Sequence, residues 1–103
     1  MSSYRLVIAP RARRQIHEID DWWRQNRPAA LDLFSRELDA ALDRLCIMPT
    51  LGTRHQPTEG AGTRKLLLPR SRHHVYYDVD EPGLEVQVVA VWHTARGSGP
   101  LLD

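Results

Sequence analysis

The sequence has a single cysteine, Cys46, so it cannot form a disulfide within the chain, and nothing in it points to an oxidising compartment. It also lacks an apolar run approaching the roughly 20 residues that a membrane crossing needs. Residues 1–10 hold no apolar stretch of signal-peptide length. We therefore expect a cytoplasmic protein with no membrane contact, and its 103 residues suit one domain spanning 1–103.

Charge of one sign is also lacking, since 14 basic residues face 13 acidic ones and the net charge is +1. This balance gives no reason to expect sequence-specific DNA binding by the chain. Lys65 is the only lysine among the basic residues. Acidic residues gather between Glu18 and Asp43, whereas arginines gather near residues 11–14 and again at 64–72. A local basic face is therefore compatible with a nearly neutral total.

Motifs for metals and phosphates are missing as well. The five histidines, Cys46 and the carboxylates show no spacing typical of a zinc site. The Gly60-Ala61-Gly62 run precedes an expected strand rather than a helix, unlike a phosphate-binding loop. We expect no metal and no cofactor, and we interpret Cys46 as a small buried hydrophobe.

Two amphipathic helices follow a first strand at residues 4–9. Apolar residues at helical spacing predict a helix beginning at Pro10, and Asn26-Arg27-Pro28 ends it. A second helix is expected from Pro28 to near Met48. Together the two helices predict an antiparallel hairpin. The apolar stripe of the second helix, widened by Leu31 and Leu42, consists of Ala30, Phe34, Leu38, Ala41 and Leu45.

The second half of the chain predicts strands. Residues 49–62 show no periodicity and predict a loop, after which strands are expected at 63–68, 72–79 and 84–93. Short turns between them favour an antiparallel meander. The fold class is therefore α+β, in the order β-α-α-β-β-β, with the helical hairpin on one face of a mainly antiparallel sheet. The other face is expected to stay partly open.

Alternation along the third strand assigns its side chains to these two faces. Tyr77 is assigned to the core, while Arg72, His74 and Tyr76 are assigned to the open face.

Several segments, in this order, resemble toxins of the RelE/ParE superfamily, and the ParE branch more than the RelE branch. They are Tyr4-Arg5-Leu6-Val7-Ile8, Asn26-Arg27-Pro28-Ala29-Ala30, the run from Leu45 to Gly52, Val75-Tyr76-Tyr77-Asp78-Val79, and Val89-Ala90-Val91-Trp92-His93 followed by Arg96. The resemblance implies a toxin made alongside a cognate, ParD-like antitoxin. ParE-like members poison DNA gyrase, and RelE-like members are ribosome-dependent mRNA endonucleases.

Cleavage of mRNA would need a base, an acid and cations around one phosphate. The candidates for this chemistry are Arg64, Arg72, Tyr76, His93 and Arg96. Lys65 is interpreted as a solvated edge residue, and His93 as a structural cap of its strand rather than an acid or base. The single lysine and a C-terminal tail without tyrosine depart from the RelE pattern. Gyrase inhibition is therefore the predicted function, with mRNA cleavage and a non-toxic, antitoxin-binding relative as alternatives.

The antitoxin is expected to be acidic where it meets Arg64, Arg72 and Arg96, and to bury the open sheet face. Trp22 lies at the edge of its helix stripe and is predicted to anchor a protein partner. The predicted partner-binding residues are Trp22, Arg64, Arg72, His74, Tyr76, His93 and Arg96.

Overall fold

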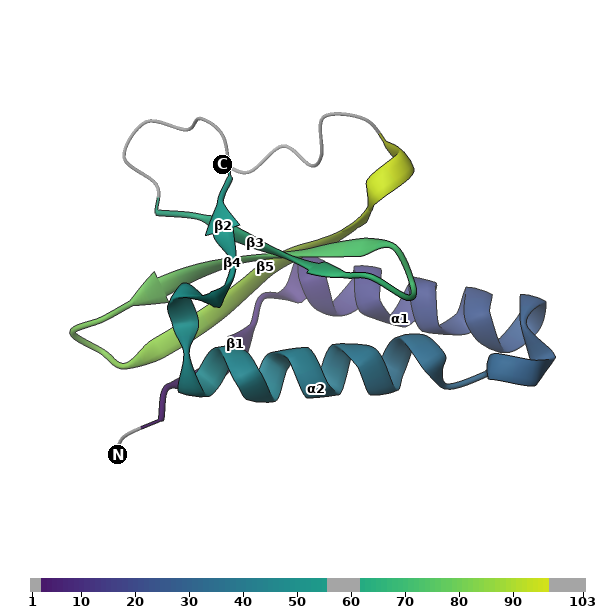
Figure 1. The fold of residues 1–103 in the computed structure, drawn as a ribbon, viewed down its shortest axis with the longest axis horizontal. Coiled ribbons are helices and arrows are strands. Elements are labelled where there is room, and N and C mark those ends of the chain that lie inside the picture. Colours follow the sequence, from purple (N-terminus) through teal and green to yellow (C-terminus); the bar gives the residue numbers. More distant parts are fainter. Residues whose placement is uncertain (1–2, 56–61, 97–103) are drawn as a thin grey trace.

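The protein, seen in a computed structural model that describes residues 3–55 and 62–96, is a mixed sheet packed against two helices (Figure 1). The α+β prediction is confirmed. The elements in chain order are β1 (Arg5–Ile8), α1 (Pro10–Asn26), a 3-10 turn (Pro28–Ala30), α2 (Leu33–Ile47), a second 3-10 turn (Pro49–Leu51), β2 (Thr53–Arg54), β3 (Arg64–Leu68), β4 (His73–Asp80), β5 (Glu85–His93) and a last 3-10 turn (Thr94–Arg96).

The sheet has five strands in the order β1-β5-β4-β3-β2. The predicted antiparallel meander is present as β3, β4 and β5, and β1 returns to pair in parallel with β5. β2 was not expected. It is a short strand, Thr53–Arg54, inside the segment that the sequence predicts to be loop throughout. Pairing with β3 creates it, and local sequence carries no signal for such a long-range contact. Residues 56–61 of the expected loop lie outside the described residues.

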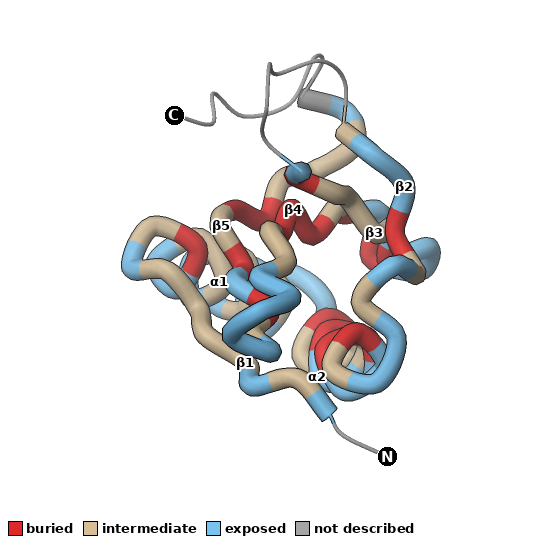
Figure 2. Tube along the Cα trace, turned by 90° about the vertical axis from the view of Figure 1, so that its left-hand side faces the viewer, coloured by how far each residue is buried: buried red, intermediate tan, exposed pale blue. Residues whose placement is uncertain are grey.

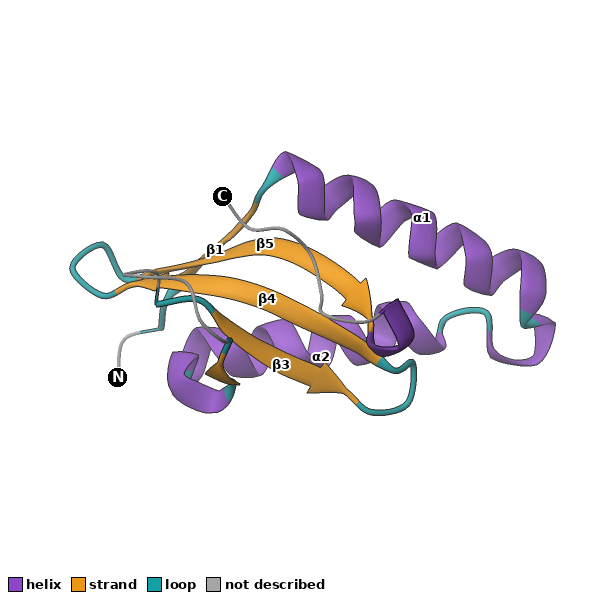
Figure 3. Cartoon of the chain, turned by 90° about the horizontal axis from the view of Figure 1, so that it is seen from above, coloured by secondary structure: helices purple, strands orange, loops and turns teal. Residues whose placement is uncertain are grey.

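α1 begins at Pro10, which suits a first helical turn, and runs beside β5 (Figure 3). A polar contact joins the two elements. The backbone N–H of Val91 in β5 donates to Gln15 Oε1 at 2.8 Å. β1 pairs with β5 only as far as Val88, so a side chain of α1 satisfies a backbone donor of β5 that β1 does not reach. This contact fixes the helix along the strand that carries His93 at its end.

α2 begins later than the sequence predicts. The chain after Pro28 forms a 3-10 turn, and the helix starts at Leu33, with Ser35 Oγ donating to the carbonyl oxygen of Asp32 at 3.1 Å. The expected stripe is confirmed for the buried residues Phe34, Leu38, Ala41, Leu42 and Leu45. The assignment of Leu31 to the stripe is wrong, because this side chain is 41% exposed in the turn before the helix.

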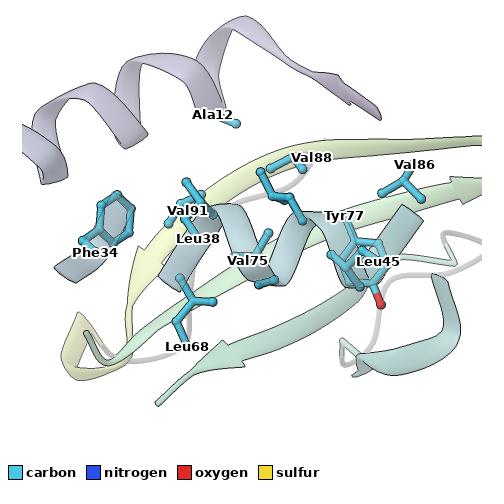
Figure 4. Close-up of a cluster of buried hydrophobic side chains, with 12 residues drawn as sticks. Ala12, Phe34, Leu38, Leu45, Leu68, Val75, Tyr77, Val86, Val88 and Val91 are labelled. Carbon is cyan, nitrogen blue, oxygen red and sulfur yellow. The ribbon is translucent and has the colours of Figure 1, made fainter. Parts of the chain in front are cut away.

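The core lies between α2 and the sheet (Figure 4). Buried residues gather on α2 and the central strands β4 and β5, as Figure 2 shows in red. Phe34, Leu45, Val75 and Tyr77 are fully buried there, and burying a large apolar side chain contributes about 1.5–3 kcal/mol. The core position predicted for Tyr77 is confirmed.

An irregularity in the pairing of β4 with β5 sets which side chains share a face. Tyr76 pairs with Ala90, but its neighbour Tyr77 pairs with Val88, so Val89 is an extra residue in β5. Alternation along β5 therefore shifts by one residue after Val88. Val88 and Val91 both join the core, a spacing that strict alternation would forbid.

Candidate functional site

The sheet divides the predicted site residues between its two faces. Paired residues of neighbouring strands point to the same side. Lys65 pairs with Tyr76, and His74 pairs with both Leu67 and Trp92, so these side chains point away from the helices. Arg64 pairs with the core residue Tyr77, and His73 pairs with His93, so these point toward the helices. The five residues considered for mRNA cleavage do not converge on one face.

Arg64 makes a contact within the fold. Its Nη1 donates to the carbonyl oxygen of Gly52 at 2.8 Å. The Tyr77 hydroxyl next to it accepts the N–H of Gly52 at 2.8 Å and donates to the carbonyl oxygen of Pro49 at 2.7 Å. These three hydrogen bonds pin the chain after α2 against β3 and β4, so Arg64 stabilises the fold at this point.

A cluster of imidazoles and a phenol lies on the far face, the side of the sheet away from α1 and α2. We name His55, Lys65, His74 and Tyr76 the far-face cluster. Ring centroids of His55 and Tyr76 are 4.9 Å apart, and those of His74 and Tyr76 are 6.0 Å apart. The expected openness of Tyr76 is wrong, because neighbouring rings and the sheet leave it only 3% exposed. Lys65, interpreted from the sequence as a solvated edge residue, shares this face with Tyr76.

Burial sets the protonation of the far-face cluster. Burial lowers the pKa of His74 and of His55, and the positive charge of Lys65 lowers both further. Burial also raises the pKa of the Tyr76 phenol. At neutral pH the cluster therefore offers neutral imidazoles, a protonated phenol and one ammonium group. The sequence does not predict His55 as a site residue. It lies in a segment expected to be irregular, and no periodicity places its ring beside Tyr76 of β4.

Arg72, His93 and Trp22 lie together on the helix side, around a pocket of about 530 Å³. We name it the α1 pocket. Its walls are the second half of α1 with Trp22 and Trp23, the turn between β3 and β4 at residues 70–72, and the end of β5 at His93. The sequence placed Arg72 on the open face by extending the strand to it. The strand begins at His73 instead, and Arg72 belongs to the turn.

The turn that carries Arg72 is held by α2 and by the chain after β5. The carboxylate of Glu37 in α2 accepts the N–H groups of Arg70 and Ser71 at 2.7 and 2.9 Å. The carbonyl oxygen of Arg72 accepts the N–H of Thr94 at 2.9 Å. Arg72 itself has a φ of 66°, a left-handed conformation that costs a non-glycine residue about 1–3 kcal/mol. These contacts hold the strained residue in place.

The tryptophan pair forms the opposite wall of the pocket. Trp22 and Trp23 meet edge to face with ring centroids 5.8 Å apart. Trp23 packs against the core, as its place in the stripe predicts, whereas Trp22 is 47% exposed. The guanidinium carbon of Arg27 lies 5.4 Å from the Trp22 ring centroid, within the range of a cation–π interaction. An exposed indole beside a cation is typical of protein-contact anchors.

Two histidines meet at the floor of the pocket. The ring centroids of His73 and His93 are 4.9 Å apart. His73 Nδ1 lies 3.0 Å from the carbonyl oxygen of Ser71, which can only accept, so Nδ1 carries the proton. His93 Nδ1 accepts the N–H of Ala95 at 3.0 Å, so the proton of the neutral ring is on Nε2. His93 thus ends the strand, as its interpretation as a cap predicts, and keeps one N–H donor.

His73 predicts a pH dependence of stability. Burial, and then the neighbouring His93, lower the pKa of His73 to about 4 from an ordinary value of 6.5. The unfolded chain therefore takes up this proton first, and stability falls as the pH drops through the window between these values. The full shift corresponds to about 3 kcal/mol. Urea unfolding at a series of pH values measures it.

Two variants complete this pH experiment. His73→Gln removes the titrating group, and we expect it to lose less stability than the parent chain between about pH 6.5 and 4. His17→Gln removes an exposed histidine of α1 and should keep the parent's dependence. A parent and His73→Gln variant with identical pH profiles would contradict the assignment.

Arg96 lies in the 3-10 turn that follows β5, two residues after Thr94. In the part of the chain that the structure describes, no three His, Cys, Asp or Glu side chains gather where they could hold a metal ion. Neither helix among residues 3–55 and 62–96 has the length and hydropathy that a membrane crossing requires.

The family of the chain follows from its sequence. The model of the ParE toxin of the type II toxin–antitoxin system parDE matches residues 6–97. The chain belongs to this family of toxins, within the RelE/ParE superfamily. The comparison with curated proteins found no match.

Solved structures with the same fold come from both branches. In the structure of the chromosomal ParDE system of P. aeruginosa, the matched chain is 20% identical in sequence to this one, with a TM-score of 0.70, and the match covers 88% of this chain and 96% of that one. The RelBE2 toxin–antitoxin complex of Mycobacterium tuberculosis is 23% identical with a TM-score of 0.63, covering 92% and 95%. The intact E. coli RelBE complex is 20% identical with a TM-score of 0.60, covering 91% and 100%. At these identities the likeness concerns the fold.

Proposed function

We propose that this toxin inhibits DNA gyrase by binding it, and that a cognate, ParD-like antitoxin neutralises it by binding in turn. The ParE family model supports the gyrase target, because ParE-like members are held to act there. The toxin–antitoxin complexes among the solved structures support an antitoxin partner. In this proposal the chain works through its surfaces and catalyses no reaction.

One observation carries the choice of a binding function over cleavage of mRNA. The two branches share one fold, so the fold alone does not decide. His93 and Arg72 lie at the α1 pocket, whereas His74 and Tyr76 lie on the far face. A base, an acid and the cations of a nuclease must reach one phosphate within hydrogen-bond distance. For the candidates drawn from the sequence, the β-sheet between Tyr76 and His93 prevents that, and Arg64 is already hydrogen-bonded to Gly52.

A supercoiling assay with purified gyrase and the full chain tests the proposal. We expect inhibition that rises with toxin concentration and is relieved by an excess of the antitoxin. Ribosomes translating a defined mRNA, incubated with the same preparation, provide the parallel measurement, and their mRNA should stay intact. Normal supercoiling together with cleaved mRNA would contradict the gyrase proposal.

The far-face cluster favours mRNA cleavage as the alternative function, because His55, His74 and the positive charge of Lys65 lie together there around the buried Tyr76 ring. Toxicity of the double variant Arg72→Ala and His93→Ala tests whether the candidates drawn from the sequence cleave mRNA. Retained toxicity would exclude a nuclease that uses these two residues. Growth unaffected by expression of the chain without antitoxin would instead indicate a non-toxic relative that only binds an antitoxin.

The antitoxin is proposed to bury the far face and to be acidic near the arginines. Arg64, Arg72 and Arg96 were expected to meet it together. Arg72 lies across the sheet from the far-face cluster, so an antitoxin that covers the far face reaches Arg72 only by passing around the end of β4. A partner that wraps an edge of the sheet, rather than one that covers a single face, fits these positions best.

A further inference from the structure

The α1 pocket has an excess of positive charge. Arg27, Arg70 and Arg72 line it, against one acidic side chain, Glu18. Three positive charges and one negative charge leave two positive charges among these four side chains. Arg27, Arg70 and Arg72 are all exposed, so their guanidinium groups are accessible to a ligand. Charge complementarity therefore favours an anionic group in this pocket.

The backbone that carries Arg70 and Arg72 is fixed before any ligand arrives. Glu37 fastens the turn through two backbone N–H groups, and Thr94 fastens Arg72 in its left-handed conformation. Strained backbone that its neighbours hold in place is found at binding and catalytic sites. The turn therefore offers two arginines from a preorganised backbone.

Two further hydrogen-bond donors lie at the pocket. The Ser71 hydroxyl has no hydrogen-bond partner among the described residues, although Ser71 is only 4% exposed and lines the pocket. Leaving a buried hydroxyl without a partner is unfavourable, and a rotation about its Cα–Cβ bond would let it donate to a ligand oxygen. The Nε2–H of His93 is the second donor, since its Nδ1 accepts the N–H of Ala95.

The opposite wall, along α1, is largely apolar. Trp22 is 47% exposed at the rim, and Ile19 and Trp23 continue the apolar wall along α1. A ligand that fills the pocket therefore needs an apolar part beside its anionic part. Glu18 on the same wall disfavours the roughly two charges of a phosphate more than the single charge of a carboxylate. Acidic side chains next to apolar ones have this chemistry.

We propose that the α1 pocket binds a carboxylate side chain of the antitoxin, with a neighbouring apolar side chain packed on Trp22. The inference rests on the proposed function insofar as the antitoxin is the partner. Arg72 and Arg70 pair with the carboxylate, and Ser71 and His93 donate to its oxygens. This places an acidic anchor on the helix side of the sheet, in addition to the contacts proposed for the far face.

Nuclear magnetic resonance of the full, nitrogen-15-labelled chain tests the inference. The probe is a short acetylated and amidated helical peptide that carries glutamates beside leucines. We expect it to shift the indole N–H signal of Trp22 and the backbone signals of Ser71 and His93. A matched peptide with glutamine in place of every glutamate should bind at least about tenfold more weakly, because charge-assisted hydrogen bonds are lost.

Variants locate the carboxylate. Arg72→Asn removes the guanidinium but tolerates the left-handed backbone, and we expect about tenfold weaker binding of the glutamate peptide. Arg13→Asn removes an exposed arginine of α1 outside the pocket and should bind like the parent. Unchanged positions of the core signals of Val75 and Val88 would show that each variant is folded. An Arg72→Asn variant that is not folded is replaced in the comparison by Arg72→Gly.

Three results would overturn the inference: equal binding of the two peptides, signal shifts confined to Lys65, His74 and Tyr76, or inorganic phosphate displacing the peptide at a lower concentration than acetate. The gyrase assay is independent of these measurements. Inhibited supercoiling with no peptide bound at the pocket would refute the inference alone, whereas pocket binding without gyrase inhibition would refute the gyrase target alone.

Discussion

Replacing Phe34 by Ala is expected to lower the free energy of unfolding by about 3–5 kcal/mol. Phe34 is fully buried near the start of α2, and its ring centroid lies 5.3 Å from that of His73. The substitution removes the apolar surface and leaves a cavity that the helix and β4 on either side cannot close. The total stability of a small domain is about 5–15 kcal/mol, so much of it would be lost. Urea unfolding followed by tryptophan fluorescence measures the change.

Leu31→Ala is the matched control. The sequence assigns Leu31 and Phe34 to one helical stripe, but the structure leaves Leu31 41% exposed in the turn before α2. We expect Leu31→Ala to change the free energy of unfolding by no more than about 0.5 kcal/mol. A comparable loss in both variants would mean that Leu31 is buried and that the second helix begins at Pro28, as periodicity alone predicts.

Replacing Gly52 by Ala is expected to cost about 1–3 kcal/mol or more, because no space exists for the added carbon. A Cβ on Gly52 would lie 2.6 Å from the carbonyl oxygen of Lys65 and 2.7 Å from the Tyr77 hydroxyl. Relief requires moving the backbone away from β3. That movement would also break the hydrogen bonds of Tyr77 and Arg64 to this segment. Thermal unfolding of the variant reports the loss.

Gly62→Ala is the control for this substitution. An added Cβ at Gly62 would meet no atom within 4 Å. We expect no loss of stability there, and even a gain of about 0.4–1 kcal/mol, because alanine reduces the entropy of the unfolded chain. Equal destabilisation by the two substitutions would show that the close approach at Gly52 is not what holds the chain after α2.

The helices and the meander could be predicted because their signals are local. Ile16, Ile19 and Trp23 recur at helical spacing, and their partial burial against the core agrees with it. Val75 and Tyr77 alternate with polar neighbours, and both are fully buried. Short turns with Pro and Gly left the three later strands few ways to pair. Local patterns of this kind do not depend on knowing the partner element.

The composition of the site could be predicted only in part. Trp22 was expected to be exposed, and it is. Tyr76 was expected on an open face, but His55 and His74 pack around it. His93 and Trp92 face opposite sides of the sheet, as alternation within one strand requires. Convergence of Arg72, Tyr76 and His93 did not follow, because it depends on where the strand begins and on which face each strand shares with its neighbours.

The sequence by itself determined the two helices and the strands other than β2, the burial of Phe34 and Tyr77, and the resemblance to a toxin family, because each depends on residues close together in the chain. Only the tertiary structure decided which side chains meet. Arg72 lines the α1 pocket from a left-handed backbone position, in a turn that Glu37 holds through Arg70 and Ser71 and that Thr94 holds through Arg72. Pairing between strands sets Lys65 beside Tyr76 and leaves Arg64 bonded to Gly52. These are contacts across long separations in the chain, which no local pattern encodes.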